Sequence, residues 1–159
     1  MRKSEVKSLS KEQALQRAAS LCSGSEHCVS QVQEKLLSWG LSDEDAEAVI
    51  ARLMDEKFID NTRFARAYCH DKFCYSHWGR IKIVQMLRHL HVSDADIAEG
   101  MAVIPEEEYL QAIADAASQK NRSLRDDDAY QRKGKLVRHL LSRGFEMSLV
   151  LDAVEELLG

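Results

Sequence analysis

The sequence predicts an all-α protein built from three tandem three-helix modules. The 159 residues include only one proline and seven glycines, and 6% are aromatic, which fits helices better than a turn-rich β-sandwich. Three segments also align with one another without gaps, namely residues 32–53, the stretch that begins at residue 83, and residues 136–157. A repeat of about 50 residues with helical periodicity is typical of a stacked helical array.

The first module shows the helix signals most clearly. A helix over residues 11–21 is expected to begin after the cap residue Ser10 and to bury Leu15 and Ala18. The second helix follows from three apolar residues at i, i+3 and i+7, which are Val29, Val32 and Leu36. Gly40 then supplies the left-handed residue that ends this helix, and Ser42 with Asp45 begins the third one.

The other two modules repeat this plan. His91 and Gly144 take the place of Gly40, and Ser93 takes the place of Ser42. The first helix of each module is expected after Asp60 and at Pro105, where a missing N–H is harmless. Their buried residues are expected to be Phe64, Ala67 and Tyr68 in the second module, and Leu110, Ile113 and Ala117 in the third.

The resulting modules span residues 1–60, 61–104 and 105–159, and a polar loop is expected between Asn121 and Asp128. No apolar run approaches the roughly 18 residues that a membrane span requires. The first ten residues are polar and basic, so we expect no secretory signal and a cytoplasmic location.

The four cysteines, Cys22, Cys28, Cys69 and Cys74, could in principle form disulfides or hold zinc. Disulfides would require an oxidising compartment, which the absent signal disfavours. Neither pair has the usual two-residue zinc spacing, although histidines lie nearby. We therefore expect free thiols and no metal.

Charge is distributed unevenly, although the net charge of −4 disfavours nonspecific nucleic-acid binding. Residues 61–92 carry six basic side chains and one acid, and residues 132–143 carry five basic side chains and no acid. Helical spacing places many of these on faces opposite the apolar residues, where they would complement phosphate groups or an acidic protein groove. A merely solvated helix face is the alternative explanation. The predicted partner-binding residues are Arg63, Arg66, Lys82, Arg88, Arg132, Lys135 and Arg138.

Aromatic residues gather just before Gly79, at Phe73, Tyr75, His77 and Trp78. Such residues either anchor a protein interface or fill the space between helices. We favour the second role, because aromatic side chains are usually buried.

No catalytic motif is present in the sequence. It lacks a glycine-rich phosphate loop, a serine-centred elbow and a paired Cys–His pattern. The acidic triplets at 106–108 and 126–128 lack the alternating ligand spacing of a calcium loop. The sequence thus predicts a binding protein without a cofactor rather than an enzyme.

The stretch Phe58-Ile59-Asp60-Asn61-Thr62-Arg63-Phe64-Ala65 resembles the pattern of a hydrophobic pair, two acids, two variable residues and Phe-Ala in RecX regulatory proteins. Gly79, Lys82-Ile83, Leu87 and Val92 continue the resemblance, and Lys35-Leu36 with Gly40-Leu41 precede it. It extends over nearly the whole chain from about residue 11.

This resemblance implies a curved string of three-helix modules, each similar to a helix-turn-helix unit. It also implies a modulator of the RecA recombinase that lies in the groove of the RecA–DNA filament and inhibits ATP hydrolysis and strand exchange. The expected partner is therefore the RecA filament, direct contact with its single- or double-stranded DNA stays an open alternative, and we expect a monomer. Asn61 departs from the second acid of the pattern, His91 replaces a glycine, and residues 23–30 are poor in arginine.

Two other functions fit the residues. One is a lone DNA-binding regulator that uses a module as a helix-turn-helix, which predicts strongly salt-dependent binding to naked duplex. The other is a helical-repeat scaffold for another protein, in which the basic faces are dispensable and the aromatic residues from Phe73 to Trp78 are essential.

Overall fold

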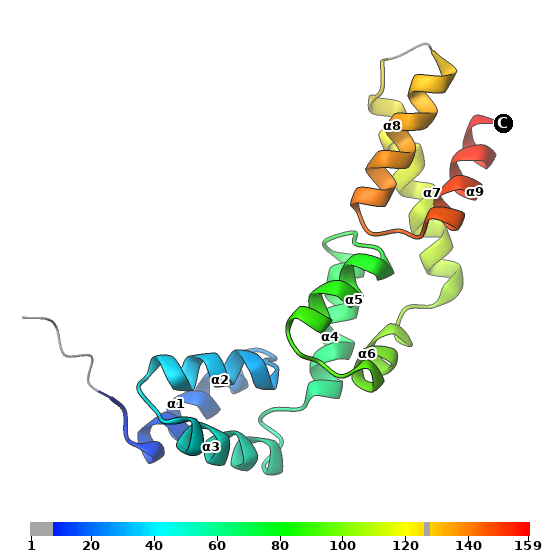
Figure 1. Cartoon of the computed structure of the whole chain (residues 1–159). Coiled ribbons are helices and arrows are strands. Elements are labelled where there is room, and N and C mark those ends of the chain that lie inside the picture. The colour runs from blue at the N-terminus through cyan, green and yellow to red at the C-terminus, as the bar shows by residue number, and fades with distance from the viewer. Residues whose placement is uncertain (1–7, 126–127) are drawn as a thin grey trace, which may run out of the picture.

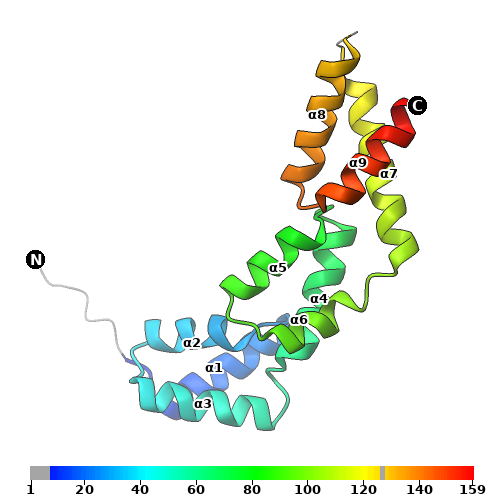
Figure 2. The same cartoon turned by 45° about the vertical axis from the view of Figure 1, so that its right-hand side comes forward.

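The computed structural model describes residues 8–125 and 128–159, and within these residues the chain forms nine helices and no strand. Figures 1 and 2 show that these helices follow one another in successive blocks along a bent, elongated molecule. The predicted fold class is thus confirmed. The helices are α1 (Lys11–Gly24), α2 (Val29–Ser38), α3 (Asp43–Asp55), α4 (Asn61–Cys74), α5 (Arg80–His89), α6 (Asp94–Met101), α7 (Glu106–Ser123), α8 (Ala129–Ser142) and α9 (Met147–Leu158).

The helix starts follow the capping residues in the sequence. The hydroxyl of Ser10 accepts a hydrogen bond from the backbone of Gln13, whose side chain accepts one from the Ser10 backbone in return. Ser42 and Ser93 accept hydrogen bonds from the backbone N–H groups three residues ahead. Each cap satisfies amides that have no partner within the helix.

The three corners between the second and third helices also form as predicted. Gly40, His91 and Gly144 have φ angles of 90°, 58° and 94°. Glycine adopts this left-handed conformation without a steric penalty, whereas His91 does so as a side-chain-bearing residue. The repeat is therefore conserved in backbone geometry even where the residue type changes.

The described residues form two hydrophobic cores, one in the first module and a larger one that the other two modules share. The first module has its own core around Val32, Leu36 and Leu53. The second and third modules share one continuous core, which includes Leu87, Tyr109 and Leu140. The second and third modules consequently pack as one unit.

Three details of the sequence prediction were wrong. In α7 the buried stripe is Tyr109, Ile113 and Ala117, whereas Leu110 is 44% exposed. In α4 the buried residues beside Phe64 are Ala65 and Cys69, whereas Ala67 is only half-buried; Tyr68 is half-buried and packs against the core as expected. In both helices the predicted face overlaps the observed one, because a helical period of 3.6 does not distinguish between neighbouring apolar residues.

The third error concerns the polar loop predicted from Asn121 to Asp128, because its first three residues belong to α7. Residues 126–127 of that predicted loop lie outside the described residues. In the part that the structure describes, no helix is both long and apolar enough to cross a bilayer.

Candidate nucleic-acid interface

A lysine–tryptophan cluster stands between α4 and α5. The ammonium groups of Lys72 and Lys82 lie 4.7 Å and 4.5 Å from the centroid of the Trp78 ring, and Lys72 also lies 5.4 Å from that of Tyr68. In the described part of the chain neither lysine belongs to an ion pair. Two ammonium groups beside an indole suit a ligand that carries phosphates and flat bases.

Local structure fixes the positions of the three residues of this Lys72–Trp78–Lys82 cluster. Lys72 lies in the last turn of α4, and its carbonyl accepts a hydrogen bond of 2.9 Å from the N–H of Trp78. Lys82 lies in the first turn of α5 and packs against Gly144 of the third module. The cluster is thus held at the junction of the second and third modules.

This junction is built by close backbone contact. The N–H groups of Gly79 and Ile81 donate to the carbonyls of Arg143 and Gly144 at 2.7 Å and 3.0 Å. A Cβ atom on Gly79 would lie only 2.4 Å from the backbone of Gly144 and of Phe145. Only glycine permits this approach, so the amino end of α5 is joined directly to the corner between α8 and α9.

Arg80 completes the junction with a polar network. Its guanidinium pairs with Glu106 and with Glu146, the latter at 3.0 Å, and lies 3.7 Å from the centroid of the Tyr109 ring. The Tyr109 hydroxyl accepts the N–H of Arg80 at 3.0 Å and donates to Glu146. Phe73 and Phe145 contact the same ring, with centroids 5.8 Å and 5.7 Å away.

The phenol of Tyr109 and the guanidinium of Arg80 keep the protonation states that the hydrogen bonds of the network require. Burial raises the pKa of Tyr109, so the phenol stays protonated and able to donate. Burial alone would lower the pKa of Arg80, but the hydrogen bonds to Glu106 and Glu146 outweigh it and raise the pKa. The guanidinium therefore stays charged between two carboxylates.

We expect Tyr109→Phe to lower the free energy of unfolding by about 1–3 kcal/mol, since it removes both hydrogen bonds of the hydroxyl and keeps the ring. Urea denaturation measures the change. Tyr130→Phe is the matched control, because Tyr130 is 85% exposed and should change stability by less than about 0.5 kcal/mol. Equal stability of Tyr109→Phe and the control would show that the network contributes nothing.

The predicted residue Arg63 lies at the other junction, between the first and second modules. Its guanidinium pairs with Glu26 at 2.5 Å and donates to the carbonyls of Lys57 and Phe58. Nearby, the side-chain oxygen of Asn61 accepts the N–H of Val29 at 3.0 Å. Arg63 thus joins two modules, and its predicted contact with a partner stays a prediction.

Two other predicted residues pair with acids of α6. Arg66 lies 2.8 Å from Glu99, and Arg88 lies 3.2 Å from Asp94. All four side chains are largely exposed, and such pairs contribute only about 0–1 kcal/mol. A phosphate or a partner's carboxylate can therefore replace either acid at low free-energy cost.

The remaining predicted residues lie on α8. Arg132 donates to the backbone and side-chain oxygens of Asn121 at 3.2 Å and 2.7 Å. Lys135 and Arg138 are exposed and one turn apart on the same helix. These three residues lie on the third module, and Lys82 lies at the border of that module. The other predicted residues, Arg63, Arg66 and Arg88, lie elsewhere on the second module.

Sequence reasoning missed Lys72 and underrated Trp78. Tyr75 and His77 are exposed, while Phe73 and Trp78 pack against the core, so the predicted filling role holds for two of the four aromatic residues. The lysine–tryptophan contacts bridge 6 and 4 positions across an irregular linker, where no helical period applies. A lysine on each side of a linker tryptophan was the available signal.

The cysteines differ in exposure, with Cys74 exposed and Cys28 and Cys69 buried. Burial raises the pKa of Cys69 to about 11. Burial and the nearby Glu26 raise the pKa of Cys22, with Arg63 opposing them. Within the described residues, no three His, Cys, Asp or Glu side chains are arranged to hold a metal ion.

A thiol reagent at pH 8 should therefore show one fast phase, from Cys74. Cys69 has about 100-fold less thiolate than an ordinary cysteine, because its pKa is two units higher, and it is also shielded. Absorbance at 412 nm with a chromogenic disulfide records the phases. Cys74→Ser should abolish the fast phase and Cys22→Ser should retain it; a fast phase that survives in Cys74→Ser would contradict the assignment.

Comparisons with known proteins cover the three modules one by one. Family models described as the first, second and third three-helix domains of RecX match residues 14–53, 60–101 and 106–154. Regulatory protein RecX of Prosthecochloris aestuarii is 33% identical over 91% of this chain and 93% of its own length. That of Leuconostoc mesenteroides is 26% identical over the same share of this chain, which spans 54% of that relative.

Solved structures show the same fold. The crystal structure of RecX from Lactobacillus salivarius superposes with a TM-score of 0.83 at 18% identity and covers 92% of this chain and 96% of that one. A second RecX crystal structure also reaches 0.83, at 21% identity, and covers 92% and 73% of the two chains. By its three matched domains and its sequence identity to a full-length relative, the chain belongs to the RecX family of regulatory proteins.

Proposed function

We propose that this protein is a negative regulator of the RecA recombinase that binds in the groove of the RecA–DNA filament and inhibits ATP hydrolysis and strand exchange. The observation that carries the proposal is the Lys72–Trp78–Lys82 cluster, which has no acidic partner in the described part of the chain. Membership of the RecX family supports RecA as the partner.

The unit formed by the second and third modules suits a filament groove. Its junction is fixed by backbone hydrogen bonds and by the Arg80 network, so cations on the two modules keep a constant spacing. Lys82 touches Gly144 in the corner that follows α8, and Lys135 and Arg138 lie earlier in that helix. A preorganised array of cations binds a regular row of phosphates with little loss of conformational entropy.

The net charge of −4 favours a filament over naked DNA as the binding target. Acids crowd the first turns of α3 and α6, at residues 43–45 and at 94 and 96, and would be repelled by a bare duplex. A protein–DNA filament supplies protein surface as well as phosphate. Binding to naked DNA alone should therefore be weak and strongly dependent on salt.

The test compares RecA filaments with naked DNA as binding targets at the same salt concentration. Fluorescence anisotropy of the labelled protein is measured against cognate RecA filaments on single-stranded DNA and against naked single- and double-stranded DNA. We expect filament binding at least about tenfold tighter than binding to either naked DNA. Equal or tighter binding to naked duplex would favour a lone DNA-binding regulator, and binding to neither would favour a scaffold for another protein.

A further inference from the structure

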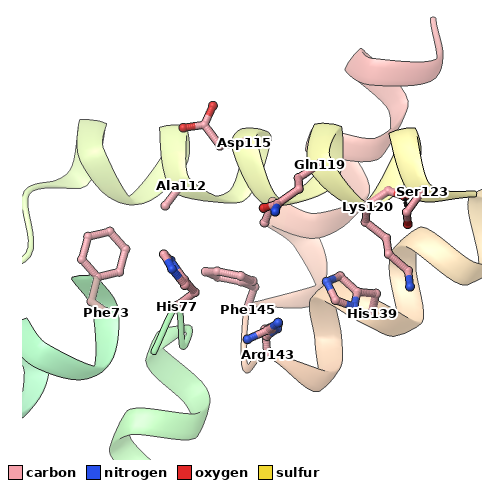
Figure 3. Close-up of a pocket in the computed structure, with 11 residues that line it drawn as sticks. Phe73, His77, Ala112, Asp115, Gln119, Lys120, Ser123, His139, Arg143 and Phe145 are labelled. Atoms are coloured by element: carbon pink, nitrogen blue, oxygen red, sulfur yellow. Dashed lines mark hydrogen bonds between the residues drawn. The ribbon is translucent and has the colours of Figure 1, made fainter. Parts of the chain in front are cut away.

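A cleft lies between α7, the carboxyl end of α8 and the linker that precedes α5, and it encloses about 480 Å³. Figure 3 shows that its two ends differ in chemistry. Phe73 and His77 line one end, Phe145 and Arg143 lie in the middle, and His139 and Lys120 line the other end, so that the basic side chains extend from the middle of the cleft to this second, basic end. A volume of this size is in the range of small-molecule sites.

The basic end has no compensating acid nearby. In the described part of the chain, neither Lys120 nor Arg143 forms an ion pair, and the guanidinium of Arg143 makes a long hydrogen bond of 3.4 Å to the carbonyl of Ser76. Burial, Lys120 and Arg143 lower the pKa of His139, in that order. The three groups are thus close enough to repel one another, and an anion between them would remove the repulsion.

Neighbouring groups do not cancel this positive field. The carbonyls of Arg143 and Gly144, in the corner that follows α8, accept hydrogen bonds from the N–H groups of Gly79 and Ile81. Asp115 also lines the cleft, but it accepts a hydrogen bond of 2.8 Å from Gln111 and points away from the basic end in Figure 3. His77, on the linker, lies toward the aromatic end.

We propose that this cleft binds a nucleotide, with a phosphate monoester at Lys120, His139 and Arg143 and the base beside Phe73, His77 and Phe145. Two permanent cations match a phosphate monoester, which carries about −1.5 to −2 charges at pH 7, better than the single charge of a carboxylate. A base is flat and apolar on its faces, which suits the aromatic end. The phosphate belongs either to a free nucleotide or to the 5′ end of a strand.

Isothermal titration of the protein alone with adenosine 5′-monophosphate tests the site independently of any effect on RecA. Lys120→Ala should weaken binding about tenfold or more, since it removes one charge-assisted contact. Lys133→Ala is the matched control, because it removes an exposed lysine of α8 outside the cleft and should change binding less than twofold. Adenosine without phosphate should bind at least about tenfold more weakly than the nucleotide.

An NMR titration of the histidine side chains gives a second readout that does not depend on a variant. The bound phosphate should raise the pKa of His139, because it outweighs the repulsion from Lys120 and Arg143 that lowers it in the free protein. His77 also lines the cleft and is followed in the same spectra. Asp115 lines the cleft as well, and its effect on the pKa of His139 is tested by substitution. An unchanged pKa of His139 at saturating nucleotide would place the phosphate elsewhere and overturn the assignment.

Two oligothymidylates that differ only at the 5′ end, with a phosphate on one and a hydroxyl on the other, distinguish a strand end from a free nucleotide as the ligand. Tighter binding of the phosphorylated strand, sensitive to Lys120→Ala, assigns the cleft to a strand end, and equal binding with retained affinity for the free nucleotide assigns it to the free form. The alternative class of ligand is a protein segment, and the probe for it is an acidic peptide with a phenylalanine beside a glutamate. Binding of that peptide without binding of the nucleotide, or equal losses in Lys120→Ala and Lys133→Ala, would overturn the proposal.

Discussion

Replacing Gly79 by alanine is expected to separate the second and third modules. The new Cβ would lie 2.4 Å from backbone atoms of Gly144 and Phe145, so two segments of main chain must move apart. The movement breaks the hydrogen bonds from Gly79 and Ile81 to Arg143 and Gly144. We expect a loss of about 3 kcal/mol in the free energy of unfolding, at the upper end of the range for overpacked sites.

Urea denaturation measures this loss, and amide hydrogen exchange at Ile81 reports the junction directly. Gly24→Ala is the matched control, because a Cβ at Gly24 meets nothing within 4 Å. The first module has a core of its own and should keep its exchange protection in Gly79→Ala. If Gly79→Ala were as stable as the control, with Ile81 equally protected, the close junction would not be a feature of the folded protein.

Reversing two charges at the Lys72–Trp78–Lys82 cluster should have the largest effect on partner binding. In Lys72→Glu/Lys82→Glu two ammonium groups become carboxylates beside the same indole, which would repel phosphate. We expect filament binding to weaken roughly 100-fold, about 1.4 kcal/mol for each site, and its dependence on salt to decrease. Binding isotherms at three salt concentrations measure both changes.

The control reverses two charges in the first module, in Lys11→Glu/Lys35→Glu, where no described ion pair involves either exposed lysine. This variant has the same net charge as Lys72→Glu/Lys82→Glu. It should lose less than about threefold in affinity, because salt screens the field of charges that lie far from the interface. Circular dichroism verifies that both variants fold. Equal losses in the two variants would indicate a nonspecific charge effect and would remove the cluster from the interface.

The helices and their order were predictable because their signals are local. Caps such as Ser10 and Ser42, the left-handed corners and the apolar period each act within a few residues of the chain. The choice between Tyr109 and Leu110 for the buried face is not local. The ring of Tyr109 packs between Phe73 and Phe145, and its hydroxyl meets Arg80 and Glu146, which lie 29 and 37 positions away in the sequence.

The candidate site was predictable only as an excess of basic residues. The sequence places Arg63 on a helix but gives no indication that Glu26, 37 residues earlier, would occupy it. Likewise, the contact between Lys82 and Trp78 and the approach of Gly79 to Gly144 depend on how modules pack. A charge pattern therefore predicts which modules bind a partner, but it does not predict which side chains make the contacts.

We propose above that this protein inhibits RecA on DNA. The most direct measurement is the ATPase rate of cognate RecA on single-stranded DNA, with this protein titrated in from well below one copy per RecA protomer. The account predicts a steep loss of ATP hydrolysis at these low ratios, because each bound copy would act on a filament of many protomers. An unchanged rate at equimolar protein, with active filaments and folded protein verified, would contradict it.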